Sequence, residues 1–172
     1  GDVAKLKKYE KKYFYKTIIT SPLTKNNKTV SSTIIRRLLQ EGRIKKANFL
    51  LDRKWEVTGK VVKGSQRGRK IGFPTCNILM KKYVIPRFGV YAVNVRINKD
   101  LKKGIANVGY RPTFNGKKLL LEVNIFGIKK NLYNKIISVI FNKFIRPEKK
   151  FKNYLELKNQ IKKDIKLAKL NV

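Results

Sequence analysis

The sequence predicts a mainly β protein: an antiparallel, Greek-key-like β-barrel of about six strands, with a helical N-terminal lead-in and a C-terminal amphipathic helix. From Trp55 onward, apolar and polar residues alternate in several short segments, as they do in half-buried strands. Gly, Asn and Pro separate these segments. Before and after them, apolar residues recur at helical spacing. We expect residues 1–51 to form the lead-in and residues 52–172 to form the barrel with its helix.

The lead-in is expected to contain three helices, a short strand and a loop. Ser31 or Ser32 can cap the central helix, whose apolar stripe includes Leu38 and Leu39, and Gly42 stands where a helix ends. The expected elements are helices at 2–13, 31–42 and 43–52, a short strand at 14–19, and a loop at 20–30.

The barrel is expected to begin with Trp55, Val57, Gly59 and Val61 on one face of a strand. The strand candidates are residues 55–64, 77–79, 89–97, 102–110, 119–128 and 134–145. The last helix is expected to begin near Pro147, which suits a first turn. One face of this helix, most of which we expect to pack onto the barrel, is marked by residues that recur at helical spacing: Phe151, Tyr154, Leu155, Lys158, Ile161, Ile165 and Ala168.

The chain is strongly basic. Lys and Arg outnumber Asp and Glu by 43 to 10, which gives a formal net charge of +33. Such a charge favours an anionic partner: nucleic acid, acidic lipid or a phosphorylated small molecule. Because lysine occurs in nearly every segment rather than in one patch, we attribute most of the charge to overall composition.

Several classes of protein are excluded by composition. With no His and a single Cys, the chain lacks Cys/His zinc sites, Ser-His-Asp triads and Cys-His dyads. The longest apolar run, residues 136–141, is far shorter than a membrane span. Residues 1–10 lack the apolar core of a secretory signal. We therefore expect a soluble, cytoplasmic protein without a membrane partner.

A glycine-rich stretch, residues 64–78, is the first candidate site. Gly68 and Gly72 allow sharp turns, and exposed amides beside basic side chains would form an anion cradle. Thr75 and Asn77 carry hard neutral oxygens that point the same way on an extended segment, which suits Mg²⁺ beside bound phosphates. The spacing matches neither a Walker loop nor the dinucleotide fingerprint. The alternative is a surface hairpin with basic side chains.

The order of residues within this stretch resembles the signature of a known protein family. The segment "GRKIGFPTCNI" resembles the G-R-x-x-G-F-P-T-A-N signature of riboflavin kinases. Further along the chain, "GVYAV", "GIANVGYRPTF", "LEVNIF" and the segment from "NLYNK" to "IKKDI" resemble later blocks of that family, in the same order. The resemblance covers about residues 52–169. It implies a β-barrel enzyme that transfers phosphate from ATP, with Mg²⁺, to riboflavin and releases FMN and ADP.

The lead-in also resembles part of a longer enzyme. Residues 30–51 are similar to the junction of bifunctional bacterial FAD synthetases, where an FMN adenylyltransferase domain leads into the kinase. We therefore expect residues 1–51 to be the end of such a domain plus linker helices, and that domain to be a partner. The family's adenylyltransferase site has an H-x-G-H motif. Because this chain has no His, we expect it to make no FAD by itself.

The resemblance assigns roles to individual residues. Glu122 is expected to be the base for the ribityl 5′-hydroxyl; it is the one acidic residue in the strand candidates after the glycine loop. Thr75 and Asn77 are expected to hold the metal. The ATP phosphates are assigned to Gly64, Gly68, Arg69, Lys70, Gly72, Thr75 and Asn77. A flap over the flavin is assigned to Arg111, Pro112, Thr113 and Phe114, with Arg146 nearby.

Three departures from the family pattern concern the details of flavin contact more than the phosphate site. Cys76 replaces the usual Ala, Asn124 stands where His is common, and residues 127–131 replace an acidic turn.

The sequence leaves two other functions open. One is a basic nucleic-acid-binding barrel, favoured by the charge and by eight Tyr and nine Phe. The other is an inactive kinase remnant, against which the retention of Thr75, Asn77 and Glu122 argues.

Overall fold

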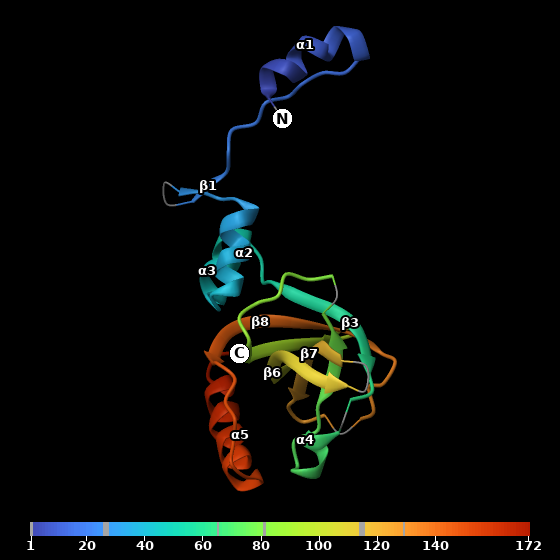
Figure 1. Ribbon diagram of the computed structural model, residues 1–172, viewed down its shortest axis with the longest axis vertical. Helices are drawn as coiled ribbons and strands as arrows, with labels where there is room; N and C mark the ends of the chain where they lie inside the picture. The colour runs from blue at the N-terminus through green and yellow to red at the C-terminus, as the bar shows by residue number, and fades with distance from the viewer. Residues whose placement is uncertain (1, 26–27, 65, 81, 114–115, 129) are drawn as a thin grey trace. The chain divides into compact units, whose positions relative to one another are not determined.

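The computed structural model describes residues 2–25, 28–64, 66–80, 82–113, 116–128 and 130–172 (Figure 1). At residues 28, 67, 70, 112–113 and 116–117 it describes the backbone alone. The chain divides into two compact units, residues 1–30 and residues 31–172.

The first unit holds helix α1, Val3–Tyr13, and a small hairpin of β1, Thr24–Lys25, and β2, Lys28–Thr29. The predicted helix is confirmed, but the predicted strand at 14–19 is wrong. That segment is irregular because its backbone turns back on α1 instead of pairing with a strand. The Tyr15 amide donates to the Glu10 carbonyl oxygen, and the Thr17 amide donates to Glu10 Oε1 at 2.7 Å.

The second unit begins with helices α2, Ser32–Gln40, and α3, Ile44–Leu51, as predicted. The Ile34 amide donates to Ser31 Oγ at 3.3 Å, so Ser31 is the cap. Asn48 joins α3 to the barrel: its Nδ2 donates to the Phe141 carbonyl, and its Oδ1 accepts from the Trp55 amide. Buried side chains of both helices lie in the same apolar cluster as the barrel interior: Leu38, Leu39, Ile44 and Ala47.

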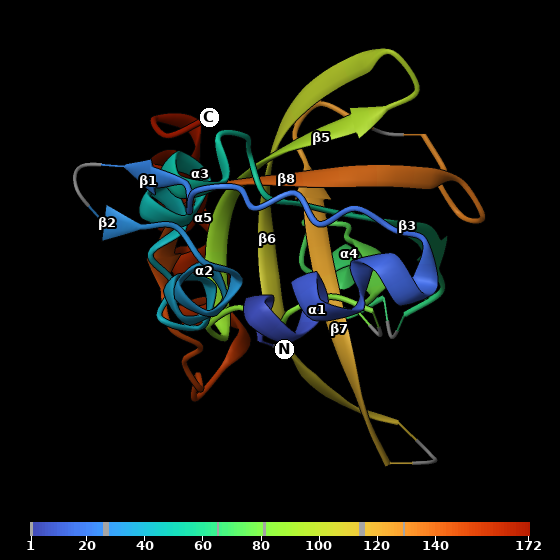
Figure 2. The ribbon, with the colours of Figure 1, turned by 90° about the horizontal axis from the view of Figure 1, so that it is seen from above.

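Six antiparallel strands form a closed barrel, as predicted (Figure 2). They are β3, Glu56–Val62; β4, Cys76–Leu79; β5, Gly89–Ile97; β6, Asp100–Thr113; β7, Gly116–Ile125; and β8, Ile136–Arg146. Their order around the barrel is β3-β4-β7-β6-β5-β8. Strands β5, β6 and β7 form a meander, and β8 closes the barrel by pairing with both β5 and β3. A short helix, α4, Arg67–Lys70, lies between β3 and β4.

Alternation along β7 separates the barrel interior from its outer wall. Leu121 and Val123 are fully buried in the core, whereas Glu122 and Asn124 are half-buried on the opposite face. This alternation agrees with the pattern read from the sequence. Strand β6 begins at Asp100, two residues earlier than predicted. Glu122 is therefore not the one acidic residue in the strands after the glycine loop.

The C-terminal helix α5, Tyr154–Lys169, starts later than predicted. The segment from Pro147 to Asn153 is not helical, because the helix is capped at Asn153, whose Oδ1 accepts from the Glu156 amide at 2.9 Å. The expected packing of Tyr154 and Leu155 on the barrel is wrong, since both are exposed. Further along, Asp164 and Ala168 are buried. No helix in the described part of the chain is long and apolar enough to cross a membrane.

Candidate active site

One row of residues crosses five strands on the outer wall of the barrel. Asn77 on β4 is directly opposite Glu122 on β7, which is opposite Asn107 on β6. Asn107 is opposite Val90 on β5, which is opposite Arg146 on β8. All five residues line one cavity of about 760 Å³. The barrel therefore gathers side chains from distant parts of the sequence into a single wall.

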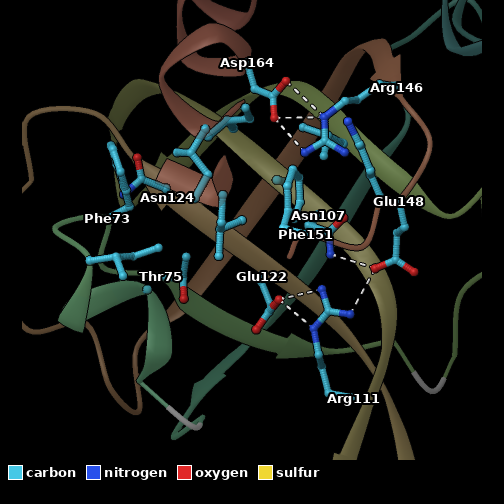
Figure 3. A pocket seen from close by; sticks show the side chains of 18 of the residues that line it. Phe73, Thr75, Asn107, Arg111, Glu122, Asn124, Arg146, Glu148, Phe151 and Asp164 are labelled. Carbon is cyan, nitrogen blue, oxygen red and sulfur yellow. Dashed lines mark hydrogen bonds and ion pairs between the residues drawn. The ribbon is translucent and has the colours of Figure 1, made fainter. Parts of the chain in front are cut away.

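The cavity has the size and mixed lining of a small-molecule site. Its lining includes the glycine-loop region, through Gly68 and Thr75, and the segment before α5, through Phe151. Figure 3 shows Thr75 and Glu122 extending into the same space, with Arg111 beside Glu122 and Arg146 beside Asp164. A ligand in this cavity would touch both the loop and the C-terminal helix.

Glycines in the loop allow close backbone approach. The Phe73 amide donates to the Gly68 carbonyl oxygen at 2.8 Å, which closes the turn after α4. A Cβ at Gly68 would lie 2.3 Å from the Phe73 carbonyl oxygen, and Gly72 adopts a φ of +87°. Both positions therefore require glycine for the reason that the sequence indicated.

Asn77 is held in an unusual polar environment. The residue is 4% exposed, and its Oδ1 has no hydrogen-bond partner among the described residues. A Cβ at Gly64 would lie 2.3 Å from Asn77 Nδ2, so Gly64 makes room for this amide. Buried polar atoms normally have partners, and an unpartnered oxygen in a cavity wall can serve a ligand. Strand β4, which carries Asn77, is paired on both sides, with β3 and β7.

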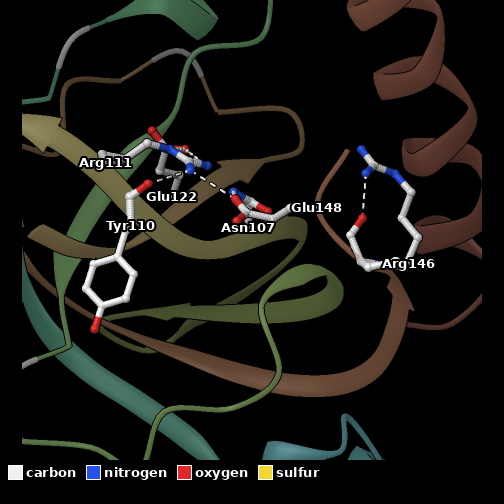
Figure 4. A network of polar contacts seen from close by, with 7 residues as sticks. Asn107, Tyr110, Arg111, Glu122, Arg146 and Glu148 are labelled. Carbon is white, nitrogen blue, oxygen red and sulfur yellow. Dashed lines mark hydrogen bonds and ion pairs between the residues drawn. The ribbon is translucent and has the colours of Figure 1, made fainter. Parts of the chain in front are cut away.

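Glu122 belongs to a chain of polar contacts (Figure 4). Arg111 Nε and Nη2 both lie 2.8 Å from Glu122 Oε2. Arg111 Nη1 donates to Glu148 Oε1 at 2.9 Å, and Asn107 Nδ2 donates to the same oxygen at 3.1 Å. Partial burial disfavours the charged guanidinium, but the two carboxylates outweigh this effect and raise the pKa of Arg111.

Arg146 holds the C-terminal helix to the barrel. Its Nε and Nη2 donate to the Asp164 carboxylate at 2.8–3.0 Å, and Asp164 is 2% exposed. Gln160 Nε2 also donates to Asp164, at 2.8 Å. The Arg146 guanidinium lies 5.8 Å from the centre of the Phe151 ring. These contacts fix α5 beside the cavity, and the flavin contact expected for Arg146 stays a prediction.

Six of the thirteen residues that the sequence singled out as site candidates line this cavity. Its lining includes Gly68, Thr75, Asn77, Arg111, Glu122 and Arg146. Arg69 is exposed and is not among the lining residues, whereas Gly64 lies behind Asn77. The side chains of Lys70, Pro112 and Thr113, and the whole of Phe114, lie outside the described residues.

Two polar residues of the site were missed in the sequence. Asn107 is paired with Glu122 in the register, but nothing in its local pattern predicts that pairing. Glu148 stands in the segment "RPEKKF", inside the last block that resembles the family, and no feature of that segment marks it as a site residue. Cys76, beside the metal candidates, packs against the core, and burial raises the pKa of its thiol.

Comparison with known proteins decides the family. A family model described as "Flavokinase: Riboflavin kinase" matches residues 51–172. The chain belongs to the riboflavin kinase family. This result favours the kinase hypothesis over the nucleic-acid-binding alternative, and it confirms the family that the sequence motifs resemble.

Two curated relatives of this riboflavin kinase domain are longer proteins. The bifunctional riboflavin kinase/FMN adenylyltransferase of Buchnera aphidicola subsp. Acyrthosiphon pisum (strain APS) is 43% identical over 168 residues, covering 96% of this chain and 54% of that protein. The protein of the same name from Bacillus subtilis (strain 168) is 42% identical over 146 residues, covering 83% and 46%. The chain thus spans about half the length of the curated relatives it matches.

A solved structure supports the fold. The crystal structure of a Streptococcus pneumoniae protein, described as a macrolide-efflux protein, superposes with a TM-score of 0.82 at 34% identity. It covers 96% of this chain, and the matched part is 54% of that protein. The likeness therefore extends beyond the barrel into residues before 51.

Proposed function

We propose that the chain transfers the γ-phosphoryl group of ATP to the ribityl 5′-hydroxyl of riboflavin and so produces FMN and ADP. The observation that carries this proposal is the pairing of Asn77, with its unpartnered buried oxygen, and Glu122 in one cavity. Phosphoryl transfer requires positioning, charge neutralisation and a group that orients the attacking hydroxyl. The two halves of this site can supply them.

The glycine loop and the start of β4 form the proposed phosphate side. Asn77 Oδ1 and the Thr75 hydroxyl are neutral hard oxygens, and the described residues contain no group of three or more acidic, Cys or His residues that could hold a metal ion. This donor set fits Mg²⁺, which takes few protein ligands when phosphates and waters complete its shell. We therefore assign Thr75 and Asn77 as the residues that would hold it. When bound, the ion would neutralise charge on the phosphates.

Glu122 is the proposed base. Both Arg111 contacts converge on Oε2, and no described residue hydrogen-bonds to Oε1. In the proposed step, Oε1 orients the 5′-hydroxyl, whose oxygen forms the new bond to the γ-phosphorus. The bond from that phosphorus to the bridging oxygen breaks, and ADP leaves with its electron pair. The hydroxyl proton passes to Glu122 late, as expected for a loose transition state.

The lead-in is proposed to belong with an FMN adenylyltransferase domain. In support, the family model begins at residue 51, whereas the match to a bifunctional relative covers 96% of the chain. That domain is then the proposed protein partner. A kinase that uses ATP and hands FMN to such a domain is expected in the cytoplasm.

The proposed activity is tested by incubating the chain with riboflavin, ATP and Mg²⁺ and separating flavins by chromatography. We expect FMN and ADP in equal amounts, and no FAD, because the chain has no His for the H-x-G-H motif. Mixtures without Mg²⁺ are the control. A folded chain that produces no FMN, or that releases ADP without FMN, would overturn the proposal.

A further inference from the structure

The base candidate is linked to the C-terminal segment by a single arginine. Arg111 at the end of β6 bridges two carboxylates: Glu122 on β7 and Glu148 in the segment between β8 and α5. We infer that Glu148 is a positioning residue for phosphoryl transfer, which acts through Arg111 to keep one oxygen of Glu122 turned to the cavity. This inference rests on the proposed function.

The orientation of the guanidinium carries the inference. An arginine beside one carboxylate favours a two-pronged pair that uses both carboxylate oxygens. Here Nε and Nη2 both lie on Glu122 Oε2, while Nη1 is drawn to Glu148 Oε1 and to the Tyr110 carbonyl. Without Glu148, Arg111 could rotate to bind both oxygens of Glu122. The oxygen needed for the hydroxyl would then be occupied.

The chain is shaped to place the Glu148 carboxylate against β6. A Cβ at Gly109 would lie 2.3 Å from Glu148 Oε1 and 2.8 Å from Oε2, so the carboxylate occupies the space that a side chain would fill. Asn107, on the same strand, donates to Glu148 Oε1. Glu148 is thus held by Asn107 and Arg111, and Gly109 leaves room for its carboxylate, although its side chain is 38% exposed.

Glu148 also lies between two residues that place the C-terminal segment at the cavity. It follows Arg146, whose pair with Asp164 fixes α5, and it precedes Phe151 in the cavity lining. A displacement of this segment would therefore reach Glu122 through one guanidinium. The structure links the side of the cavity formed by the helix to the group that would orient the acceptor hydroxyl.

The test is a double-mutant cycle on FMN formation with Glu148→Gln, Arg111→Gln and the double variant. We expect Glu148→Gln to lower kcat by about tenfold and to change both KM values by less than about twofold, since misplaced reacting groups lose rate more than binding. In the Arg111→Gln background the same change should have no further effect. The matched control is Glu56→Gln, which removes a carboxylate from an ion pair with Arg96 elsewhere on the barrel.

A second variant retains the carboxylate but displaces it. Gly109→Ala introduces a methyl group where Glu148 lies and should reproduce the fall in kcat. The inference is overturned if kcat of both variants stays within about twofold of the parent chain. It is also overturned if the Glu148 and Arg111 effects are additive, or if KM alone changes. Failure of the parent chain to form FMN would instead overturn the proposed function.

Discussion

Asn77 and Glu122 are directly opposed residues on β4 and β7, in adjacent strands of the closed barrel. Opposed residues of an antiparallel pair hold their Cβ atoms about 4.5–5.5 Å apart. The proposed metal-side oxygen and the proposed base are therefore fixed relative to each other by strand pairing, and they do not depend on a loop for their spacing. A site built on paired strands keeps its geometry before substrate binds.

Removing the metal-side oxygens should weaken the use of Mg·ATP. We expect Thr75→Ala and Asn77→Ala to raise the Mg²⁺ concentration needed for half-maximal FMN formation by about tenfold or more, because Mg²⁺ takes few protein ligands. The measurement is a Mg²⁺ titration at fixed ATP. Asn142→Ala is the matched control, since Asn142 on β8 also has an unpartnered buried amide group but does not line the cavity. Equal titration curves for all chains would place the metal elsewhere.

Two glycine substitutions should separate function from stability. Gly64→Ala would press a Cβ against the Asn77 amide, the movable end of a side chain, so we expect impaired Mg²⁺ use with little loss of stability. Gly127 has a φ of +72° and open space around its Cβ position, so Gly127→Ala should cost about 1 kcal/mol of stability and leave the Mg²⁺ dependence unchanged. Titration of Mg²⁺ and urea unfolding of both variants check this. Impaired Mg²⁺ use in Gly127→Ala, with normal Mg²⁺ use in Gly64→Ala, would contradict the role given to Gly64.

The pair between Arg146 and Asp164 should contribute strongly to stability. Asp164→Asn leaves a partly buried guanidinium without its counter-charge, and we expect unfolding free energy to fall by about 3 kcal/mol. Arg96→Gln breaks the exposed pair with Glu56 and should cost less than about 1 kcal/mol. Urea unfolding with an unchanged m-value measures both changes. Similar losses in the two variants would mean that burial does not distinguish these pairs.

Hydrogen exchange should change sharply between the two compact units. Helix α1 buries none of its residues, so its amides should exchange rapidly. Residues from Ser31 onward should be protected, because Leu38 and Leu39 lie in the barrel's apolar cluster. Exchange measured by mass spectrometry on peptides would locate the change, and protection of α1 equal to that of β5 would contradict this prediction.

The barrel strands could be predicted from sequence because each strand is marked by features within its own segment of the chain. Alternation in β3 and β7 marks their inner and outer faces, and turn formers mark their ends. The start of α5 could not be predicted, because Pro147 and Asn153 both suit a helix start and only the cap contact with Glu156 decides between them. The segment at 14–19 has strand-forming residues, but nothing in its composition says that a partner strand is missing.

The candidate site could be predicted only in part, because some of its residues belong to local motifs and others meet only in the folded chain. Thr75, Asn77 and Glu122 stand in motifs with a recognisable order, so the sequence identifies them. The contacts of Glu148 with Arg111 and Asn107 join residues that are 37 and 41 positions apart. Such pairings depend on register and on the return of the chain after β8. A single sequence contains no direct signal for them.

The base role of Glu122 is the central claim, and Glu122→Gln tests it most directly. The substitution keeps size and hydrogen-bonding ability but removes the proton acceptor, and a general base typically contributes about 10²–10⁴-fold in rate. The measurement is kcat for FMN formation together with the ATP dissociation constant. We predict that kcat falls by about 10²-fold, at the lower end because the transition state is loose, while ATP binding is unchanged or slightly tighter. A fall of less than about threefold in a folded variant would contradict the base role.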